Sequence, residues 1–288
     1  MSALSLAYAG SLTCLVQESL GPAWQAATGQ AWHGTAGGSR ELARLLRQGE
    51  LRADVLLSAD EQVFQQELGD PAQPGVVAWH ATFAATELGL AFSPRSRYHA
   101  PIEEAAAGRR SWWDVLQEPG LRFARPDPDR DPKGYRTLFL FQLAEKLEGV
   151  PGLAARVLGP ALNPTQLVPA PELIPRLRAG EFDACPVYRS QATEEQLPYV
   201  ALPAAVNLGY EEHADLYRQA HYVSSDGVEY RGAPIRYAAA LVGDPLTAWA
   251  ASFLVFLAQR EAQAALAAHG FRPLTRFVTI SKQPPGED

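Results

Sequence analysis

The sequence lacks the features that mark several large classes of protein. Its 288 residues contain only two cysteines, Cys14 and Cys185, which lie too far apart to build a disulfide framework or a zinc site. Their apolar surroundings favour buried free thiols. No apolar run is long enough to span a bilayer, and the longest candidate, 248–257, ends at a polar Gln-Arg-Glu sequence. We interpret that run as a core helix.

Local motifs for catalysis and nucleotide binding are also absent. The sequence has no Gly-x-Ser-x-Gly, no phosphate loop ending in Gly-Lys-Ser/Thr, and no Gly-x-Gly-x-x-Gly after a predicted strand. Its six histidines are scattered without the spacing of metal ligands. The net charge is -7 and there is no basic run, which argues against nucleic-acid binding. We therefore expect no enzyme, no resident cofactor and no nucleic-acid partner.

The length and composition favour a soluble globular protein with two lobes. The chain is too long for one typical compact core, and its residues are 47% hydrophobic and 20% charged. An apolar strand at 4–9 comes first, without a basic region followed by a hydrophobic core. Two alternatives follow: a cytoplasmic protein, or an extracytoplasmic protein whose signal segment has been removed.

Strand and helix patterns alternate along the chain, which predicts an α/β fold. The order β-α-β-α-β in the first sixty residues predicts a parallel, doubly wound sheet. The apolar run 83–92 is interpreted as the crossover into a second lobe that repeats the pattern. We assign 1–85 and 205–288 to lobe 1 and 86–204 to lobe 2, joined by a hinge of two segments. The predicted strands are 4–9, 30–33, 53–57, 121–124, 182–188, 199–208 and 234–242; the helices are 12–20, 22–28, 41–48, 134–147, 172–179 and 245–269; a hairpin spans 222–231.

Two serine-containing turns follow the first two predicted strands. Gly10-Ser11 opens the first helix, and Gly37-Gly38-Ser39 opens the next one. Ligands of open α/β sheets bind at the carboxyl ends of strands, and helix N-termini favour anions. We therefore expect the backbone N–H groups and the serine hydroxyls of both turns to donate to one anion. A plain N-capping serine is the alternative explanation for each turn.

Polar segments also follow later strands. Ser58 ends the third strand and could supply another donor, while Asp60 could cap the next helix. In the acidic loop 127–134, Asp131 is predicted to cap a helix that has Pro132 at its first position. Arg189 follows a second-lobe strand and could pair with an anion or with a carboxylate, as a surface ion pair.

Taken in order, these segments resemble the molybdate/tungstate-binding proteins of ABC importers, in the branch typified by archaeal tungstate-binding proteins. The most specific matching segment is Asp131-Pro132-x-Gly134-Tyr135-Arg136-Thr137, and the others are 8–12, 37–39, 53–60, 83–88, 188–190 and 202–208. The resemblance implies a type II periplasmic-binding fold with two lobes that close on a tetrahedral oxyanion. It also implies secretion and docking to a permease and an ATPase; we expect a monomer.

The resemblance also implies which residues bind the anion. Asp131 carries over as a carboxylate that faces the molybdenum or tungsten centre, and Glu194 becomes the second such carboxylate if the match is shifted by one residue. A carboxylate beside a dianion is repelled strongly, but these metals can add an oxygen ligand whereas the sulfur of sulfate cannot. Two inward carboxylates would therefore select against sulfate. The remaining candidate ligand-binding residues are Ser11, Ser39, Gly10, Gly38, Ser58, Ala85 and Tyr188.

Two positions depart from the pattern of the family. Simple counting places Thr193 where the second carboxylate is usual, and a shift of one residue brings Glu194 there. Without that shift the coordination would stay tetrahedral. Lys133 stands where a cysteine is often found. These departures leave molybdate, tungstate and sulfate open as the anion.

Two other functions remain as alternatives. Regulators reuse this fold, so the chain could be a cytoplasmic effector-sensing module, although no helix-turn-helix is found at either end. An enzyme could use Asp131 and Glu194 as acid and base, but two acids at distant sequence positions are weak evidence for a catalytic pair.

Overall fold

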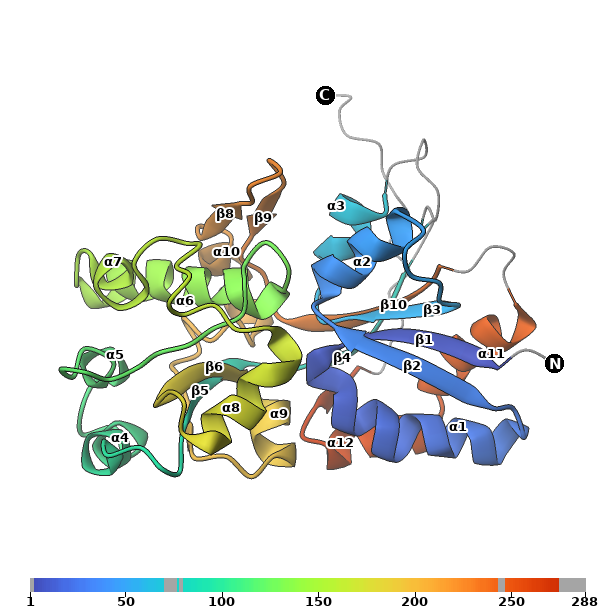
Figure 1. Ribbon diagram of the computed structural model, residues 1–288, viewed down its shortest axis with the longest axis horizontal. Helices are drawn as coiled ribbons and strands as arrows, with labels where there is room; N and C mark the ends of the chain where they lie inside the picture. Colours follow the sequence, from blue (N-terminus) through green and yellow to red (C-terminus); the bar gives the residue numbers. More distant parts are fainter. Residues whose placement is uncertain (1–2, 70–76, 78–79, 243–246, 275–288) are drawn as a thin grey trace. The chain divides into compact units, whose positions relative to one another are not determined.

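The computed structural model describes residues 3–69, 77, 80–242 and 247–274, which form two compact units. Unit 1 comprises residues 1–85, 236–268 and 272–288, and unit 2 comprises residues 86–235 and 269–271. Figure 1 labels most of the helices and strands of both units. Among the described residues, no helix has the length and apolar character needed to cross a membrane.

Unit 1 is built on a mixed sheet whose strands, among the described residues, run in the order β11-β4-β10-β3-β1-β2. Strand β1 pairs in parallel with both of its neighbours, and β10 lies antiparallel between β3 and β4. The carboxyl ends of β1, β2, β3 and β4 therefore lie at one edge of the sheet, together with the start of β10. The strands are β1 (Leu4–Ala9), β2 (Trp32–Gly37), β3 (Val55–Ser58), β4 (Ala81–Ala85), β10 (Arg236–Leu241) and β11 (Arg272–Pro273).

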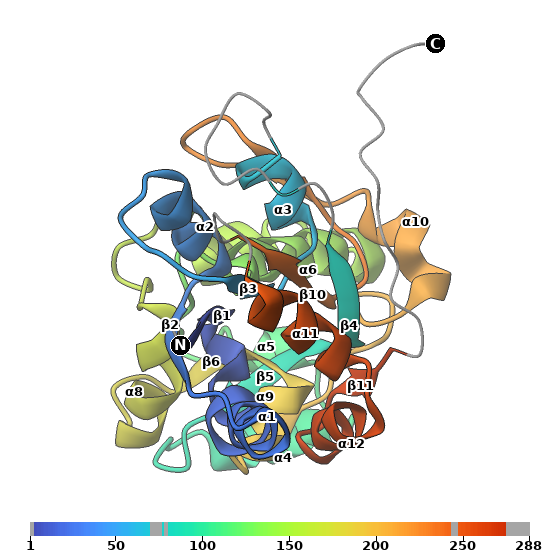
Figure 2. The same cartoon turned by 90° about the vertical axis from the view of Figure 1, so that its right-hand side faces the viewer.

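Helices cover both faces of this sheet. Figures 1 and 2 show α2 (Ser39–Arg47) and α3 (Gln62–Glu67) on one face, and α1 (Gly21–Thr28), α11 (Ala248–Leu257) and α12 (Arg260–Ala268) on the other. Leu42, Phe64 and Leu56 belong to the buried cluster between the sheet and α2–α3. On the opposite face Trp24 contacts Phe253 and Phe256 edge to face, at ring-centroid distances of 5.6 and 5.8 Å. Unit 1 is thus doubly wound, as predicted.

The first helical segment is continuous, although a break at Gly21–Pro22 was expected. A 3₁₀ turn, η1 (Gly10–Leu12), leads into a π-helix, η2 (Leu15–Leu20), and then directly into α1. The wider π-turn lets the Gly21 N–H bond to the Val16 carbonyl, so Pro22 can enter the helix without an N–H of its own. A Cβ at Gly21 would lie 2.0 Å from the Trp32 ring, so close packing accounts for this glycine.

Strand β2 extends beyond the predicted strand 30–33 and through the glycine-containing stretch that follows it. Its residues from Trp32 to Gly37 pair in register with the whole of β1. A Cβ at Gly34 would lie 2.5 Å from the ring of Tyr8 on the neighbouring strand. The glycine at this position therefore accommodates a cross-strand aromatic ring, and does not mark a turn.

Unit 2 has a smaller sheet. Strand β5 (Leu88–Phe92) lies between β6 (Ala184–Tyr188) and β7 (Tyr199–Val200) and is antiparallel to both. Parallel bridges at Phe123–Ala184 and Arg125–Leu167 extend this layer beyond β6. The predicted strand 199–208 is reduced to the two residues of β7. The helices are α4 (His99–Ala106), α5 (Trp112–Val115), α6 (Pro132–Glu148), α7 (Leu153–Leu158), α8 (Leu173–Ala179), α9 (Arg189–Glu194) and α10 (Ala214–Tyr217).

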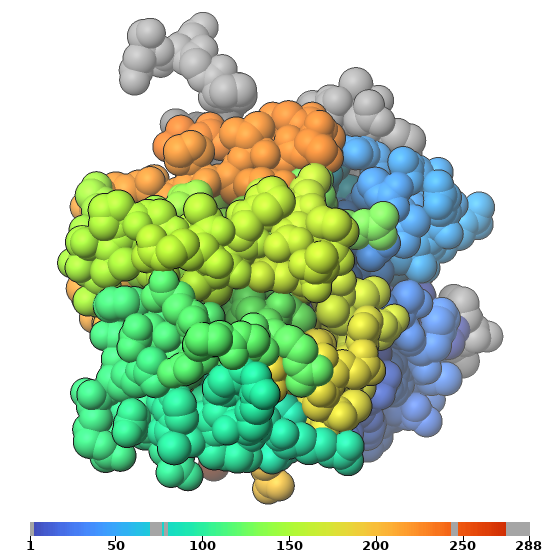
Figure 3. All heavy atoms as spheres, turned by 60° about the vertical axis from the view of Figure 1, so that its left-hand side comes forward, coloured from blue at the N-terminus to red at the C-terminus, as the bar shows by residue number. Residues whose placement is uncertain are grey.

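Residues 205–235 belong to unit 2, whereas the sequence assigned them to lobe 1. The hairpin of β8 (His221–Val223) and β9 (Glu229–Arg231) packs on α6, where the Tyr230 ring stacks on Tyr135 at a centroid distance of 4.6 Å. Figure 3 shows this face of unit 2, with the hairpin in orange beside α6 and α7 in yellow-green. The first crossing, at 85/86, lies where the sequence placed it.

The two cysteines should differ in reactivity. Cys185 is fully buried in β6, and burial raises the pKa of its thiol to about 12, whereas Cys14 is partly exposed. Since the thiolate is the reactive species, we expect an aromatic disulfide reagent to modify one thiol in the native protein and both in denaturant. Rapid modification of both thiols in the native protein would contradict the burial of Cys185.

Candidate functional site

Six of the predicted binding residues gather at one edge of the unit 1 sheet. Gly10 and Ser11 follow β1, Gly38 and Ser39 follow β2, Ser58 ends β3 and Ala85 ends β4. The pairing of Ala9 with Gly37 sets the ends of β1 and β2 side by side. Because these strands run in the same direction, the residues lie along a single edge.

Ser39 does not cap α2, so the N-cap interpretation was wrong. Gly38 is the cap residue and Ser39 is the first residue of the helix. The Ser39 hydroxyl, which is fully buried, accepts the backbone N–H of Ala59 at 3.0 Å. A hydroxyl that accepts in this way still has its own proton to donate. The structure therefore fixes the position of Ser39 through the β3–α3 turn and leaves its O–H as a donor.

Ser11 forms a hydrogen bond with a tyrosine that was not among the predicted residues. Its Oγ lies 2.9 Å from the hydroxyl of Tyr237, which is buried near the start of β10. When Tyr237 donates in this bond, Ser11 keeps its own proton for a second acceptor. Tyr237 lies within an apolar strand pattern, where a buried tyrosine looks like an ordinary core residue, and 226 positions separate it from Ser11.

Ser58 stabilises a turn. Its hydroxyl donates to the Asp60 carbonyl at 2.7 Å and accepts the Asp60 N–H at 3.1 Å. The Asp60 carboxylate in turn accepts the N–H of Gln62 at the start of α3. Because the Ser58 proton is already engaged, the structure gives this residue a local role, and its role as an anion donor stays a prediction.

A buried ion pair lies next to Ser39. Arg40, in the first turn of α2, donates to the Glu67 carboxylate at 2.6 Å, and their side chains are only 3% and 2% exposed. Arg47 lies 3.6 Å from the other carboxylate oxygen of Glu67. The pair joins the start of α2 to the end of α3 and thus helps to fix Ser39.

In unit 2, Asp131 caps α6 as the sequence predicted. Its Oδ1 accepts the Lys133 N–H at 2.8 Å, and Pro132 occupies the first turn. Gly134 makes this arrangement possible: a Cβ there would lie 2.6 Å from Pro128 N and 2.7 Å from the Asp127 carbonyl oxygen. The acidic loop therefore rests directly on the first turn of the helix.

Tyr188 lies at the carboxyl end of β6, close to two buried basic side chains. Arg136 donates to its hydroxyl oxygen at 2.9 Å, and the Lys133 ammonium lies 5.1 Å from its ring centroid. Lys133 also donates to the side-chain oxygen of Gln191 at 2.7 Å. Burial lowers the pKa of Lys133, while the nearby Asp131 acts in the opposite direction. In the sequence Arg136 stands out only as part of the Asp-Pro-x-Gly-Tyr-Arg motif, and no local signal indicates its contact with Tyr188.

Glu194 lies at the end of α9 and interacts with a histidine. Its carboxylate is 2.6 Å from Nδ1 of His269, and its side chain is 5% exposed.

The neighbouring Thr193 is exposed, and its hydroxyl donates to the Arg189 carbonyl. Arg189 pairs with the Glu87 carboxylate at 2.5 Å, in line with the ion-pair alternative. The roles of Asp131 and Glu194 at the metal centre of an oxyanion stay predictions. Among the described residues, no group of three or more His, Cys, Asp and Glu could hold a metal ion.

Comparison with known proteins identifies the family. The model of the bacterial extracellular solute-binding protein family matches residues 4–272. The chain belongs to this family. The solute-binding protein is 37% identical to a Haloferax volcanii protein named as an ABC transporter molybdenum-binding protein. The match covers 82% of this chain and 71% of the relative. It is 27% identical to the molybdate/tungstate-binding protein of Thermococcus kodakarensis, over 73% of its own length and 63% of that protein.

The fold of the solute-binding protein is that of periplasmic binding proteins. The periplasmic molybdate-binding protein of Azotobacter vinelandii superposes with a TM-score of 0.59 at 17% identity, covering 93% of this chain and 98% of that one. Together with the antiparallel β10 between β3 and β4 in unit 1, this agreement confirms the predicted type II fold. The family is a class of binding proteins and not of enzymes.

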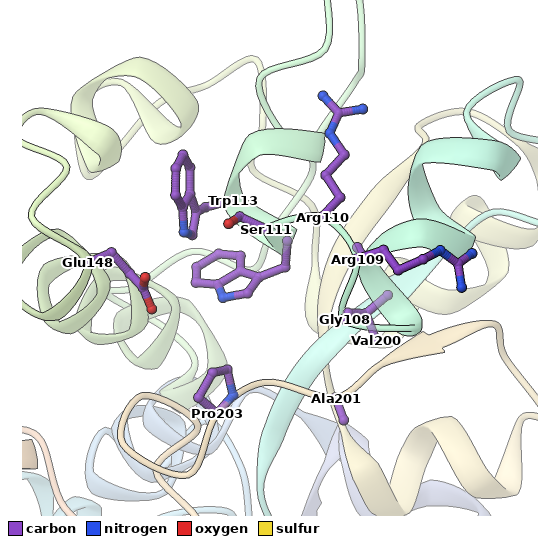
Figure 4. Close-up of a pocket in the computed structure, with 11 residues that line it drawn as sticks. Gly108, Arg109, Arg110, Ser111, Trp113, Glu148, Val200, Ala201 and Pro203 are labelled. Carbon is purple, nitrogen blue, oxygen red and sulfur yellow. The ribbon is translucent and has the colours of Figure 1, made fainter.

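A pocket in unit 2 of the solute-binding protein lies apart from the candidate residues. It has a volume of about 340 Å³ and is bounded by the α4–α5 connection, the end of α6 and the segment after β7. Figure 4 shows Trp113 and Glu148 at one side, with the side chains of Arg109 and Arg110 directed away from them. Arg110 is paired with Asp114 and Glu118. None of the predicted anion-binding residues lines this pocket.

Proposed function

We propose that this solute-binding protein binds molybdate or tungstate and delivers the anion to the permease and ATPase of an ABC importer. The names of two relatives, a molybdenum-binding protein and a molybdate/tungstate-binding protein, support the choice of anion. In this proposal Ser11 and Ser39 donate to the anion, and Asp131 and Tyr188 are further candidate contacts. The protein acts outside the cytoplasm, as a monomer, with no resident cofactor and no catalytic turnover.

The observation that carries the proposal is the bonding of the buried Ser39 hydroxyl. It accepts the Ala59 N–H, and its own proton is available to donate to a ligand. Ser11 can act in the same way beside Tyr237. The first amides of α2 add further donors, because the first N–H groups of a helix have no partner within the helix. A fully deprotonated oxyanion offers only acceptors and thus matches this set.

Calorimetric titration of Ser39→Ala with tungstate tests the proposal. We expect the affinity to fall by about 1–2 kcal/mol, or roughly 5- to 30-fold, which is the cost of losing a hydrogen bond to a charged group. Ser11→Ala should have an effect of similar size, whereas Ser5→Ala, at the opposite end of β1, should leave the affinity unchanged. If Ser39→Ala and Ser11→Ala both bind tungstate like the wild type, these serines do not contact the anion.

A further inference from the structure

We infer that Lys133 and Arg136 make the site selective for doubly charged oxyanions over singly charged oxyanions of the same size. This inference rests on the proposed function, because it concerns the anion bound near Tyr188 and Asp131. It assigns to Lys133 the role of an electrostatic specificity residue.

The geometry places both cations around the two candidate contacts of unit 2. The Lys133 ammonium lies 5.1 Å from the centroid of the Tyr188 ring, and the Arg136 guanidinium carbon lies 5.8 Å from it. Arg136 also donates to the Tyr188 hydroxyl oxygen. Asp131 is tied to the same segment, since its carboxylate accepts the backbone N–H of Lys133.

Burial strengthens the electrostatic interactions of these two side chains. Lys133 and Arg136 are 2% and 3% exposed, so water screens their charges far less than those of surface residues. Asp131, also buried, supplies one negative charge against their two positive charges. With Lys133 protonated, the form that the nearby Asp131 favours against the effect of burial, the cluster of these three residues carries a net charge of +1, which offsets the repulsion between the Asp131 carboxylate and an approaching anion.

The electrostatic gain depends on the charge of the ligand. Coulomb energy is proportional to that charge, so a dianion gains twice as much from the same cation as a monoanion does. Tungstate and perrhenate are both tetrahedral oxyanions of similar size, with charges of −2 and −1. The ratio of their affinities thus measures the field of the cluster separately from shape and hydrogen bonding.

A purely structural role for Lys133 predicts a different result. Lys133 connects the first turn of α6 to α9 through its bond to Gln191, and losing that bond could disturb the site. Such a disturbance would weaken tungstate and perrhenate by the same factor. Only a loss of charge changes the ratio between them.

The test is calorimetric titration of the full chain with tungstate and with perrhenate, for the wild type, Lys133→Met, Lys133→Arg and Arg130→Met. For Lys133→Met we expect tungstate to weaken about tenfold and perrhenate about threefold, since the effect scales with ligand charge. Lys133→Arg should restore most of the tungstate preference. Arg130 lies on the same loop but its side chain is 59% exposed, so Arg130→Met should leave the ratio unchanged.

The outcomes separate this inference from the proposed function. If wild-type protein binds tungstate and Lys133→Met leaves the tungstate/perrhenate ratio unchanged, the inference is wrong while the proposed function stands. An equal change of the ratio in Arg130→Met would also overturn it, because net charge alone would then explain the preference. If wild-type protein binds neither anion, the proposed function itself fails.

Discussion

Glu67→Ala is expected to lower the free energy of unfolding by about 3–5 kcal/mol, because it removes a buried carboxylate that pairs with the buried Arg40 guanidinium. The two side chains are 2.6 Å apart and almost completely excluded from solvent. The Arg40 guanidinium then keeps its desolvation cost and loses the attraction of the Glu67 carboxylate. Thermal or denaturant unfolding measures the change.

The same substitution should also weaken oxyanion binding, because Arg40 is adjacent to Ser39 in the first turn of α2. Glu67→Gln keeps the side-chain volume and one acceptor, so its effect should be smaller. Asp215→Ala provides a matched control, since it removes the carboxylate of an exposed ion pair with Arg218. Exposed pairs contribute little, so its stability should stay close to that of the wild type. Equal effects of Glu67→Ala and Asp215→Ala would contradict the burial of the pair.

Gly134→Ala is expected to destabilise the protein by about 1–3 kcal/mol, the usual cost of overpacking. The added methyl group would meet the backbone of Asp127 and Pro128 at 2.6–2.7 Å, and no rotamer change can relieve such a contact. The sign of the change in stability distinguishes this contact from an ordinary helix position. Replacing glycine by alanine in an ordinary helix interior stabilises a protein by about 0.5–1 kcal/mol.

Gly134→Ala should weaken tungstate binding as well as lower the stability of the protein. The displaced loop carries Asp131, whose carboxylate fixes the first turn of α6. We therefore expect weaker tungstate binding as well as a lower melting temperature. A variant more stable than the wild type, with unchanged affinity, would show that the acidic loop does not rest on this glycine.

Features with a local sequence signal could be predicted. Strand β1 and the Asp131 cap of α6 follow from residues next to each other, and both are present in the structure. The serine turns were placed correctly at the ends of β1 and β2, because the parallel order of a doubly wound sheet fixes which ends meet.

Contacts between distant residues could not be predicted in the same way. The Ser39 hydroxyl accepts an amide 20 residues away, so an isolated turn looks like an ordinary helix cap. Lys133 and Gln191 are 58 residues apart, and the sequence shows Lys133 only as a departure from a pattern. The second boundary was misplaced because the stacking of Tyr230 on Tyr135, which holds the hairpin on α6, has no local signature.

The most direct test of the proposed function is a calorimetric titration of the purified chain with tungstate or molybdate, with and without a large excess of sulfate. The proposal predicts one saturable site with a submicromolar Kd that excess sulfate leaves essentially unchanged. The absence of saturable heat with both metal oxyanions would contradict it. Loss of the signal in sulfate would instead identify a sulfate-type oxyanion binder on the same fold.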